Sequence, residues 1–272
     1  SVTGVQTCAL PISMIIAARA NDLSIVQELI AAKAVLESNP QWKAVQPLGE
    51  AITNGNEKIV HALLTAGAHA HIALQMSVGD NMYETPLHRE IRKNKPNISI
   101  INDLLDHGAD VNYKDLFVLL EEPIRYAIRD DQRDVVKLLF DRGAKLPSYS
   151  ICDLNEDMEI AKTLLIKGES AKTLCQYGNS VLFQKKSAPL MSLLILNGAD
   201  VNVVNKRGET ALEWYAEIHT YEETKKLLID HGADMNIPSH QRAFYTWAFN
   251  CSPNAYPYPY NCQMMEIGRA HV

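Results

Sequence analysis

Long apolar runs are absent from this chain of 272 residues, as is an excess of positive charge. No stretch approaches the ~18 consecutive apolar residues that a membrane-spanning helix needs, so we expect no membrane association. The net charge of -6 argues against nucleic acid as a partner, because its backbone attracts clustered Lys and Arg. The sequence also lacks a Gly-rich phosphate loop, a nucleophile elbow and paired catalytic carboxylates, so we do not expect an enzyme.

Cysteine is sparse, and its few positions form no pattern. Five cysteines lack the density of a disulfide framework, which favours a reducing, intracellular compartment. Cys251 and Cys262 flank a tyrosine- and proline-rich segment, and we interpret them as free thiols, with a disulfide or a zinc site as alternatives. His69 and His71 can point the same way, but no nearby Cys or carboxylate pattern completes four metal ligands. We therefore expect no metal ion and no other cofactor.

A short sequence motif occurs three times with nearly the same residues: DHGADVN at 106–112, GADVN at 198–202 and DHGADMN at 230–236. Weaker copies are centred on three further glycines, which are Gly67, Gly143 and Gly168. Successive glycines of this set lie 41, 35, 25, 30 and 34 residues apart. A period near 33 is typical of stacked helical repeats.

The sequence Thr-Pro-Leu-His at 85–88 has the chemistry of a helix start. Thr85 can cap a helix by accepting the amide of His88, and Pro86 takes the first helical position, where a missing amide costs nothing. Leu87 and Ile91, four residues apart, give this helix an inward-facing stripe.

A second helix is expected to follow at once. We expect the first helix to end at Asn94 in a left-handed backbone turn, a conformation that favours Gly or Asn. Apolar residues of 100–105 then have helical spacing, and Gly108 ends the second helix with the same turn. Neither helix can bury its apolar face alone, so its stability must come from stacking on neighbouring repeats.

The Thr-Pro-Leu-His motif and the repeated glycine motif resemble the ankyrin repeat. The resemblance implies an all-α solenoid of about seven helix-pair repeats with short or irregular hairpin tips. It covers residues 14–237 and is strongest in the second, third, fourth and seventh repeats. The fifth repeat is degenerate, and Lys33 replaces the glycine of the first. The resemblance also implies that His88 bonds backbone groups between repeats.

The tips between repeats are expected to differ in length. Twelve residues separate Gly198 from Thr210, as the repeat requires, whereas eighteen separate Gly67 from Thr85 and predict an enlarged hairpin around 72–83. Only four residues separate Gly143 from Pro147, which leaves no room for a hairpin.

Both ends of the chain depart from the repeat pattern. Residues 1–12 and 266–272 read as translated adapters from a sequencing library, so we expect them to be non-native and the gene to continue beyond one or both ends. The repeat array then spans 13–237. Residues 238–265 are expected to form a partial repeat or C-terminal cap followed by a Tyr/Pro tail, since their prolines exclude a second helix.

Proteins of the family that this chain resembles generally bind other proteins through the hairpin tips and the concave face of the first helices. We therefore expect a non-catalytic, monomeric scaffold that binds another protein. The alternative is the targeting arm of a larger enzyme or host-directed effector whose other domain is missing from this fragment.

The expected contact residues occupy tip and first-helix positions, where a side chain is not needed to pack the core. For each tryptophan among them the alternative is simple filling between repeats. The apolar stretch at 116–120 is either an early turn of the fourth repeat's first helix, which we favour, or an exposed patch. The partner-binding residues expected from the sequence are Trp42, Lys43, Asn81, Met82, Glu84, Arg92, Lys93, Tyr126, Arg129, Lys206, Arg207 and Trp214.

Overall fold

The structure is a computed structural model that describes residues 6–37, 46–71, 74–75, 83–114, 120–183, 185, 187–216 and 221–234. It divides into two compact units, unit 1 (Ser1–Asn155) and unit 2 (Glu156–Val272). The helices of unit 1 are α1 (Gln6–Arg19), α2 (Leu23–Ala31), α3 (Pro47–Asn54), α4 (Glu57–Thr65), α5 (Pro86–Ile91), α6 (Ile98–Asp106), α7 (Pro123–Arg129), α8 (Arg133–Asp141) and α9 (Ser150–Asp153). Those of unit 2 are α10 (Met158–Ile166), the 3-10 turn Gln176–Gly178, α11 (Ala188–Leu196), α12 (Ala211–Ala216) and α13 (Glu222–Asp230).

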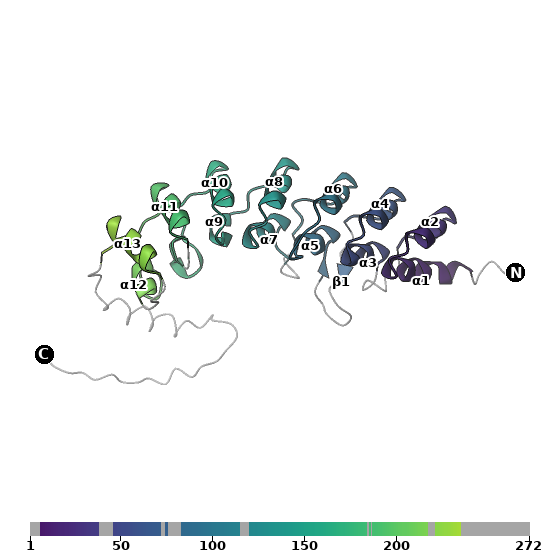
Figure 1. The fold of residues 1–272 in the computed structure, drawn as a ribbon, viewed down its shortest axis with the longest axis horizontal. Coiled ribbons are helices and arrows are strands. Elements are labelled where there is room, and N and C mark those ends of the chain that lie inside the picture. Colours follow the sequence, from purple (N-terminus) through teal and green to yellow (C-terminus); the bar gives the residue numbers. More distant parts are fainter. Residues whose placement is uncertain are drawn as a thin grey trace, which may run out of the picture. The chain divides into compact units, whose positions relative to one another are not determined.

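Unit 1 consists of helix pairs stacked in two rows (Figure 1). The first helix of each pair packs on the next, α1 on α3, α3 on α5, α5 on α7 and α7 on α9. In the second row α2 packs on α4 and α4 on α6. The apolar residues that face these contacts, such as Ile52, Leu87, Ile91 and Ile124, are completely buried. This arrangement confirms the expected all-α repeat fold.

Helix caps follow the chemistry of the sequence. The Thr85 side chain accepts the His88 amide at the start of α5, as expected, and Asn56 and Asn97 cap α4 and α6 in the same way. Lys33 replaces glycine in the first repeat and still takes the left-handed conformation, with φ 58°. Lysine therefore carries here a backbone strain that glycine would avoid.

The expected left-handed turn at Asn94 is wrong. Helix α5 ends at Ile91, and Asn94 is not among the described residues with positive φ. The reason is the length of the connection. Asn97 caps α6 six residues after Ile91, whereas Asn56 caps α4 only four residues after Ile52, so the longer loop turns without a left-handed residue.

The tips differ as the spacing predicts. The long tip before α5 contains a two-stranded antiparallel pairing of β1 (Leu74–Gln75) with β2 (Tyr83–Glu84), with Leu74 opposite Glu84. Between α8 and α9 the chain runs through turns only. Of the apolar stretch 116–120 the structure describes Leu120, which is buried and therefore not part of an exposed patch. It is not helical, because α7 begins only at Pro123, so the expected early turn of this helix does not include Leu120.

Unit 2 departs from the repeat plan before α11. Here α11 packs against α10 and α13, and α12 packs against α13. In place of a first helix, the described residues 180–183 form a turn. The buried Tyr215 hydroxyl lies 2.9 Å from the Leu182 carbonyl oxygen and 2.6 Å from that of Lys185, so it ties this segment to α12. Burial raises the pKa of Tyr215, which keeps the hydroxyl protonated as a donor.

The asparagine that ends the repeated motif joins neighbouring repeats. The Asn112 amide nitrogen donates to the carbonyl oxygen of Gly143 (3.3 Å), and its side-chain oxygen accepts the amide of Lys145 (2.8 Å). Asp110 holds this asparagine in place by accepting its backbone amide at 2.8 Å. The side chain thus satisfies backbone groups that the end of a helix leaves unpaired.

Unit 2 repeats this bridge, and the first repeat of unit 1 varies it. Asn202 donates to the Gly232 carbonyl oxygen (2.9 Å) and accepts the Asp234 amide (2.8 Å). In the first repeat Glu37 stands at the same position and accepts the backbone amide of His69 at 3.1 Å. The Glu37 carboxylate therefore forms one of the two bonds of the bridge, the one in which the side chain accepts a backbone amide of the next repeat.

Two further observations bear on the expectations from sequence. Helix α1 begins at Gln6, so residues 6–12 of the segment expected to be non-native are helical, while 235–272 lie outside the described residues. Cys152 and Cys175 are each disulfide-bonded, which corrects the expectation of reduced cysteines at these positions. A low density of cysteine argues against a disulfide framework but not against an individual bond.

Candidate protein-binding surface of unit 1

Helices α5 and α7 bring together three of the residues expected to bind a partner: Arg92, Tyr126 and Arg129, here called the arginine–tyrosine cluster. The guanidinium carbon of Arg92 lies 5.3 Å from the centre of the Tyr126 ring, and that of Arg129 lies 5.8 Å from it. These distances allow cation–π attraction to one phenol ring from two repeats. About a third of the Arg92 side chain and 44% of the Arg129 side chain remain exposed.

Glu84 anchors the first of these arginines. Its carboxylate accepts hydrogen bonds from Arg89 (2.8 Å) and from Arg92 (3.3 Å), and its side chain is only 7% exposed. The sequence placed Glu84 among exposed tip residues that touch a partner. The expected exposure is wrong, because Glu84 at the end of β2 is buried and its carboxylate pairs with Arg89 of α5 and with Arg92, which caps the end of α5. There it orients both arginines.

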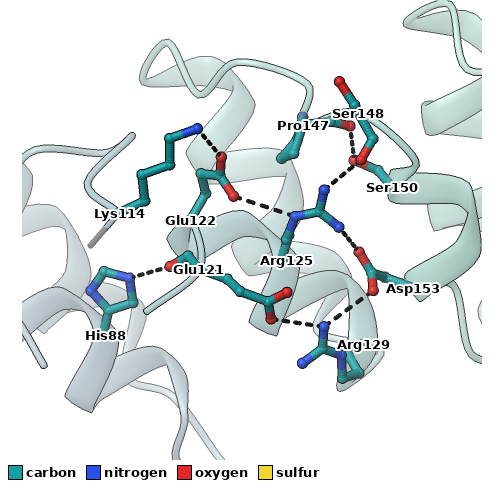
Figure 2. A network of polar contacts seen from close by, with 10 residues as sticks. All are labelled: His88, Lys114, Glu121, Glu122, Arg125, Arg129, Pro147, Ser148, Ser150 and Asp153. Carbon is teal, nitrogen blue, oxygen red and sulfur yellow. Dashed lines mark hydrogen bonds and ion pairs between the residues drawn. The ribbon is translucent and has the colours of Figure 1, made fainter. Parts of the chain in front are cut away.

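Two carboxylates anchor Arg129 (Figure 2). The Nη2 atom donates to Glu121 at 2.9 Å and to Asp153 at 3.1 Å. Glu121 comes from the segment before α7, and Asp153 is the last residue of α9. Because α9 follows α8 without a hairpin, Asp153 lies within reach of α7. An arginine held from two sides loses less side-chain freedom when it binds a partner.

Arg125 forms the centre of a second, more buried set of contacts (Figure 2). It donates to Glu122 at 3.3 Å, to the Asp153 carboxylate and to the Ser148 carbonyl oxygen. Its side chain is 17% exposed, so it orders the connection before α9 and presents little surface of its own.

Glu122 is the acidic partner of this second set. Burial alone would raise its pKa, but a hydrogen bond to its own backbone amide and the contacts with Lys114 and Arg125 hold the pKa below the usual value. The carboxylate therefore stays ionised and keeps both cations in place.

His88 connects α5 to the same segment. Its Nε2 atom donates to the Glu121 carbonyl oxygen at 2.8 Å, and its Nδ1 atom lies 2.7 Å from the Thr85 hydroxyl. Burial lowers the pKa of His88 to about 4, so the ring is neutral at pH 7 and Nδ1 accepts the hydroxyl proton. The bond joins two repeats, as the resemblance to ankyrin repeats implied.

Lys93, another expected contact residue, points into the repeat stack. Its ammonium group pairs with the buried Glu90 at 2.6 Å and donates to the Ile52 carbonyl oxygen. Glu90 also accepts the Asn97 amide at 2.7 Å. The side chain is about a quarter exposed, so its main contacts are within the protein.

The remaining expected residues lie elsewhere. In unit 2 Lys206 and Arg207 are exposed, and Trp214 is half-buried with its ring edge-to-face with Tyr215 at 4.9 Å. Trp42, Lys43, Asn81 and Met82 lie outside the described residues. Sequence reasoning missed Arg125, Asp153 and the exposed Tyr177, because their roles depend on how the connections between helices fold.

The described residues gather no group of three or more His, Cys, Asp or Glu that would hold a metal ion. His69 and His71 stack edge-to-face at 5.4 Å, and His69 also pairs with Glu37. Among the helices that the structure describes, none has the length and apolar character needed to cross a membrane.

Comparison with known proteins gives a consistent result. The family model described as ankyrin repeats (3 copies) matches residues 14–115 and 148–239, more than half of the chain. The human ASB11 ankyrin repeat domain is similar in fold, with a TM-score of 0.63 and 22% identity over 81% of this chain and 98% of that domain. The ankyrin repeat domain of Bcl-3, described as a unique member of the IkappaB protein family, has a TM-score of 0.57 and 21% identity over 80% and 97%. No curated protein sequence matches the chain significantly.

Proposed function

Because the chain belongs to the ankyrin-repeat family, whose domains are generally protein-interaction modules, we propose that it is a non-catalytic scaffold that binds another protein through the first helices of unit 1. The proposed contact surface is the arginine–tyrosine cluster together with the neighbouring tips. We propose further that the protein acts as a monomer inside the cell.

The observation that carries this proposal is the way in which Arg92 and Arg129 are held. Both guanidinium groups are partly exposed and lie beside the ring of Tyr126. Each is also held by ion pairs with carboxylates of this chain. Packing alone does not require such an arrangement. Tyrosine and arginine are enriched among the residues that dominate protein–protein binding energy, and a preorganised side chain loses less entropy on binding.

A second candidate function is that of a targeting arm for a catalytic domain elsewhere in a longer protein. Both functions use the same surface, so a longer gene product with a catalytic domain would favour the second without changing the binding residues.

The test is a binding measurement on a partner captured by affinity purification and then produced in pure form. We expect Tyr126→Ala and Arg129→Ala each to weaken binding by about thirtyfold, as is typical of residues at the centre of an interface. The matched controls are Lys58→Ala in α4 and Lys137→Ala in α8, two exposed positions on second helices. Loss of binding in the controls with retention in the cluster variants would place the interface on the other row of helices.

A further inference from the structure

The tip that precedes α11 in unit 2 presents an aromatic side chain on a strained backbone. Tyr177 lies in the 3-10 turn Gln176–Gly178 with φ 61° and ψ 17°. A bulky residue rarely adopts this left-handed conformation, and such strain persists only where the surrounding structure enforces it. Leu174 starts the tip and is bridged to Ser180 across it, which closes the loop.

The next tip along the chain holds this strained loop in place. The Lys206 amide donates to the Tyr177 carbonyl oxygen at 2.8 Å, and Asn205 donates to the side chain of Asn179 at 2.8 Å. The Asn205 side chain also accepts the amide of Arg207 at 2.8 Å, which shapes its own tip. One backbone and one side-chain hydrogen bond therefore join the two tips, and we call them together the finger pair (residues 174–180 and 205–209).

Exposed apolar and cationic side chains gather on this finger pair. Leu174 is 51% exposed and Tyr177 is 39% exposed, and the Arg207 guanidinium carbon lies 5.5 Å from the centre of the Tyr177 ring. Lys206 and Arg207 are both exposed and form no ion pair within the described part of the chain. Glu209, the nearby carboxylate, is directed to Asn205 at 3.2 Å.

This lack of pairing contrasts with unit 1. There six cations in and around the arginine–tyrosine cluster are each paired with a carboxylate: Arg89, Arg92, Lys93, Lys114, Arg125 and Arg129. The chain as a whole has a net charge of -6. These two cations of the finger pair, which have no ion pair among the described residues, and the two exposed apolar side chains beside them therefore form a local surface that is positively charged and partly apolar. Such a surface complements a partner that carries negative charge next to an apolar side chain.

We propose that the finger pair is a second docking surface, which binds an acidic segment of a partner protein whose carboxylates flank an aromatic or aliphatic side chain. Arg207 and Lys206 attract the carboxylates, while Tyr177 and Leu174 contact the apolar side chain. This inference extends the proposed function, because it gives the partner a chemical class, but it depends on residues of unit 2 alone.

Single-stranded nucleic acid is the other ligand class that cations beside an aromatic ring can bind. Proteins that bind such nucleic acid present a row of positive charges along the sugar–phosphate backbone and aromatic side chains on which the bases stack. The finger pair offers two cations without an ion pair among the described residues, and the net negative charge of the rest of the chain repels phosphate. The charges therefore favour an acidic peptide.

The experiment titrates the isotope-labelled full chain with an acetylated ten-residue peptide of Glu and Asp around one central Phe, followed by NMR. We expect amide shifts confined to residues 174–180 and 205–209, and weaker binding when NaCl is raised from about 0.1 to about 0.5 M, since salt screens exposed charges. The variant Lys206→Ala/Arg207→Ala should weaken binding about tenfold, in line with the loss of two exposed charge contacts. Tyr177→Gly, which removes the ring and the backbone strain together, should weaken it as well.

Matched controls complete the design. Lys137→Ala/Lys226→Ala removes the same number of exposed charges elsewhere and should leave the affinity within twofold of the unmodified chain, as should Tyr126→Ala/Arg129→Ala. Equal binding of a peptide with Lys in place of Glu and Asp, or binding of a ten-nucleotide single-stranded DNA but not of the acidic peptide, would overturn the inference. So would the absence of shifts in the finger pair at millimolar acidic peptide. These outcomes leave the proposed function intact, because its test uses variants of α5 and α7.

Discussion

The neutral ring of His88 donates from Nε2 to the carbonyl oxygen of Glu121 at 2.8 Å, and this single bond links the third repeat to the start of the fourth. The same ring accepts the hydroxyl proton of Thr85. A buried imidazole that uses both nitrogens in this way has one favourable protonation state.

The first prediction is that His88 makes stability depend on pH. Its pKa falls from 6.5 to about 4 on folding, so the unfolded chain binds more protons than the native chain between these values, and stability is lost as the pH falls through this window. Between pH 7 and pH 5 the loss from this residue should be about 2 kcal/mol. Urea unfolding of the wild type and of His88→Gln at both pH values measures it. An equal pH dependence in the two proteins would contradict the assignment.

The second prediction concerns the cap of α5. Thr85→Ala removes the acceptor of the His88 amide and also the donor to His88 Nδ1, which then stays buried without a partner. The expected cost is about 2 kcal/mol, above the ~1 kcal/mol of an ordinary cap. Thr85→Ser keeps the hydroxyl and should recover most of the stability. A cost of the ordinary size for Thr85→Ala would show that the imidazole contact adds nothing.

The third prediction concerns the tie between α12 and the turn before α11. Tyr215→Phe removes a buried hydroxyl that lies near two carbonyl oxygens, and we expect a loss of about 1–3 kcal/mol. Hydrogen exchange of the amides at 181–183 should accelerate in this variant, because the turn loses its link to α12. Unchanged exchange there would mean that packing alone holds the turn.

The fourth prediction concerns how much a buried leucine in the core of unit 2 contributes to the free energy of unfolding. Leu228 in α13 is completely buried, so Leu228→Ala should cost about 2–5 kcal/mol through lost burial and a residual cavity. Denaturant unfolding followed by circular dichroism gives the value. Its neighbour Ile229 is 43% exposed, and Ile229→Ala, as the matched control, should cost much less.

Local spacing was enough to predict the helix pairs and the Thr85 cap, because each depends on residues a few positions apart. The inter-repeat role of His88 followed instead from the resemblance to ankyrin repeats, because its partner Glu121 lies 33 residues later. The spacing in the sixth repeat also indicates that its first helix is missing. Ser187 caps α11 only seven residues after Ser180, whereas Asn56 caps α4 ten residues after Gln46, so the sixth repeat has too few residues for a full first helix and its connection.

The candidate surface was harder to predict than the fold. Arg92, Tyr126 and Arg129 followed from their positions on first helices, but the inward turn of Glu84 depends on the pairing of β2 with β1. The contact of Asp153 with Arg129 depends on where α9 begins after a connection without a hairpin. Tyr177 gave no signal, because nothing local marks a tyrosine for positive φ; the hydrogen bond from Lys206, about thirty residues later, enforces it.

The asparagine bridges have a consequence for how such a chain can change in evolution. Asn112 and Asn202 each bond to backbone groups of the next repeat only, and backbone groups are the same whatever side chains that repeat carries. Duplication or loss of one whole repeat therefore leaves every bridge with an equivalent partner. A deletion of a few residues instead shifts the next glycine out of reach, so length changes are tolerated in whole repeats or within the tips.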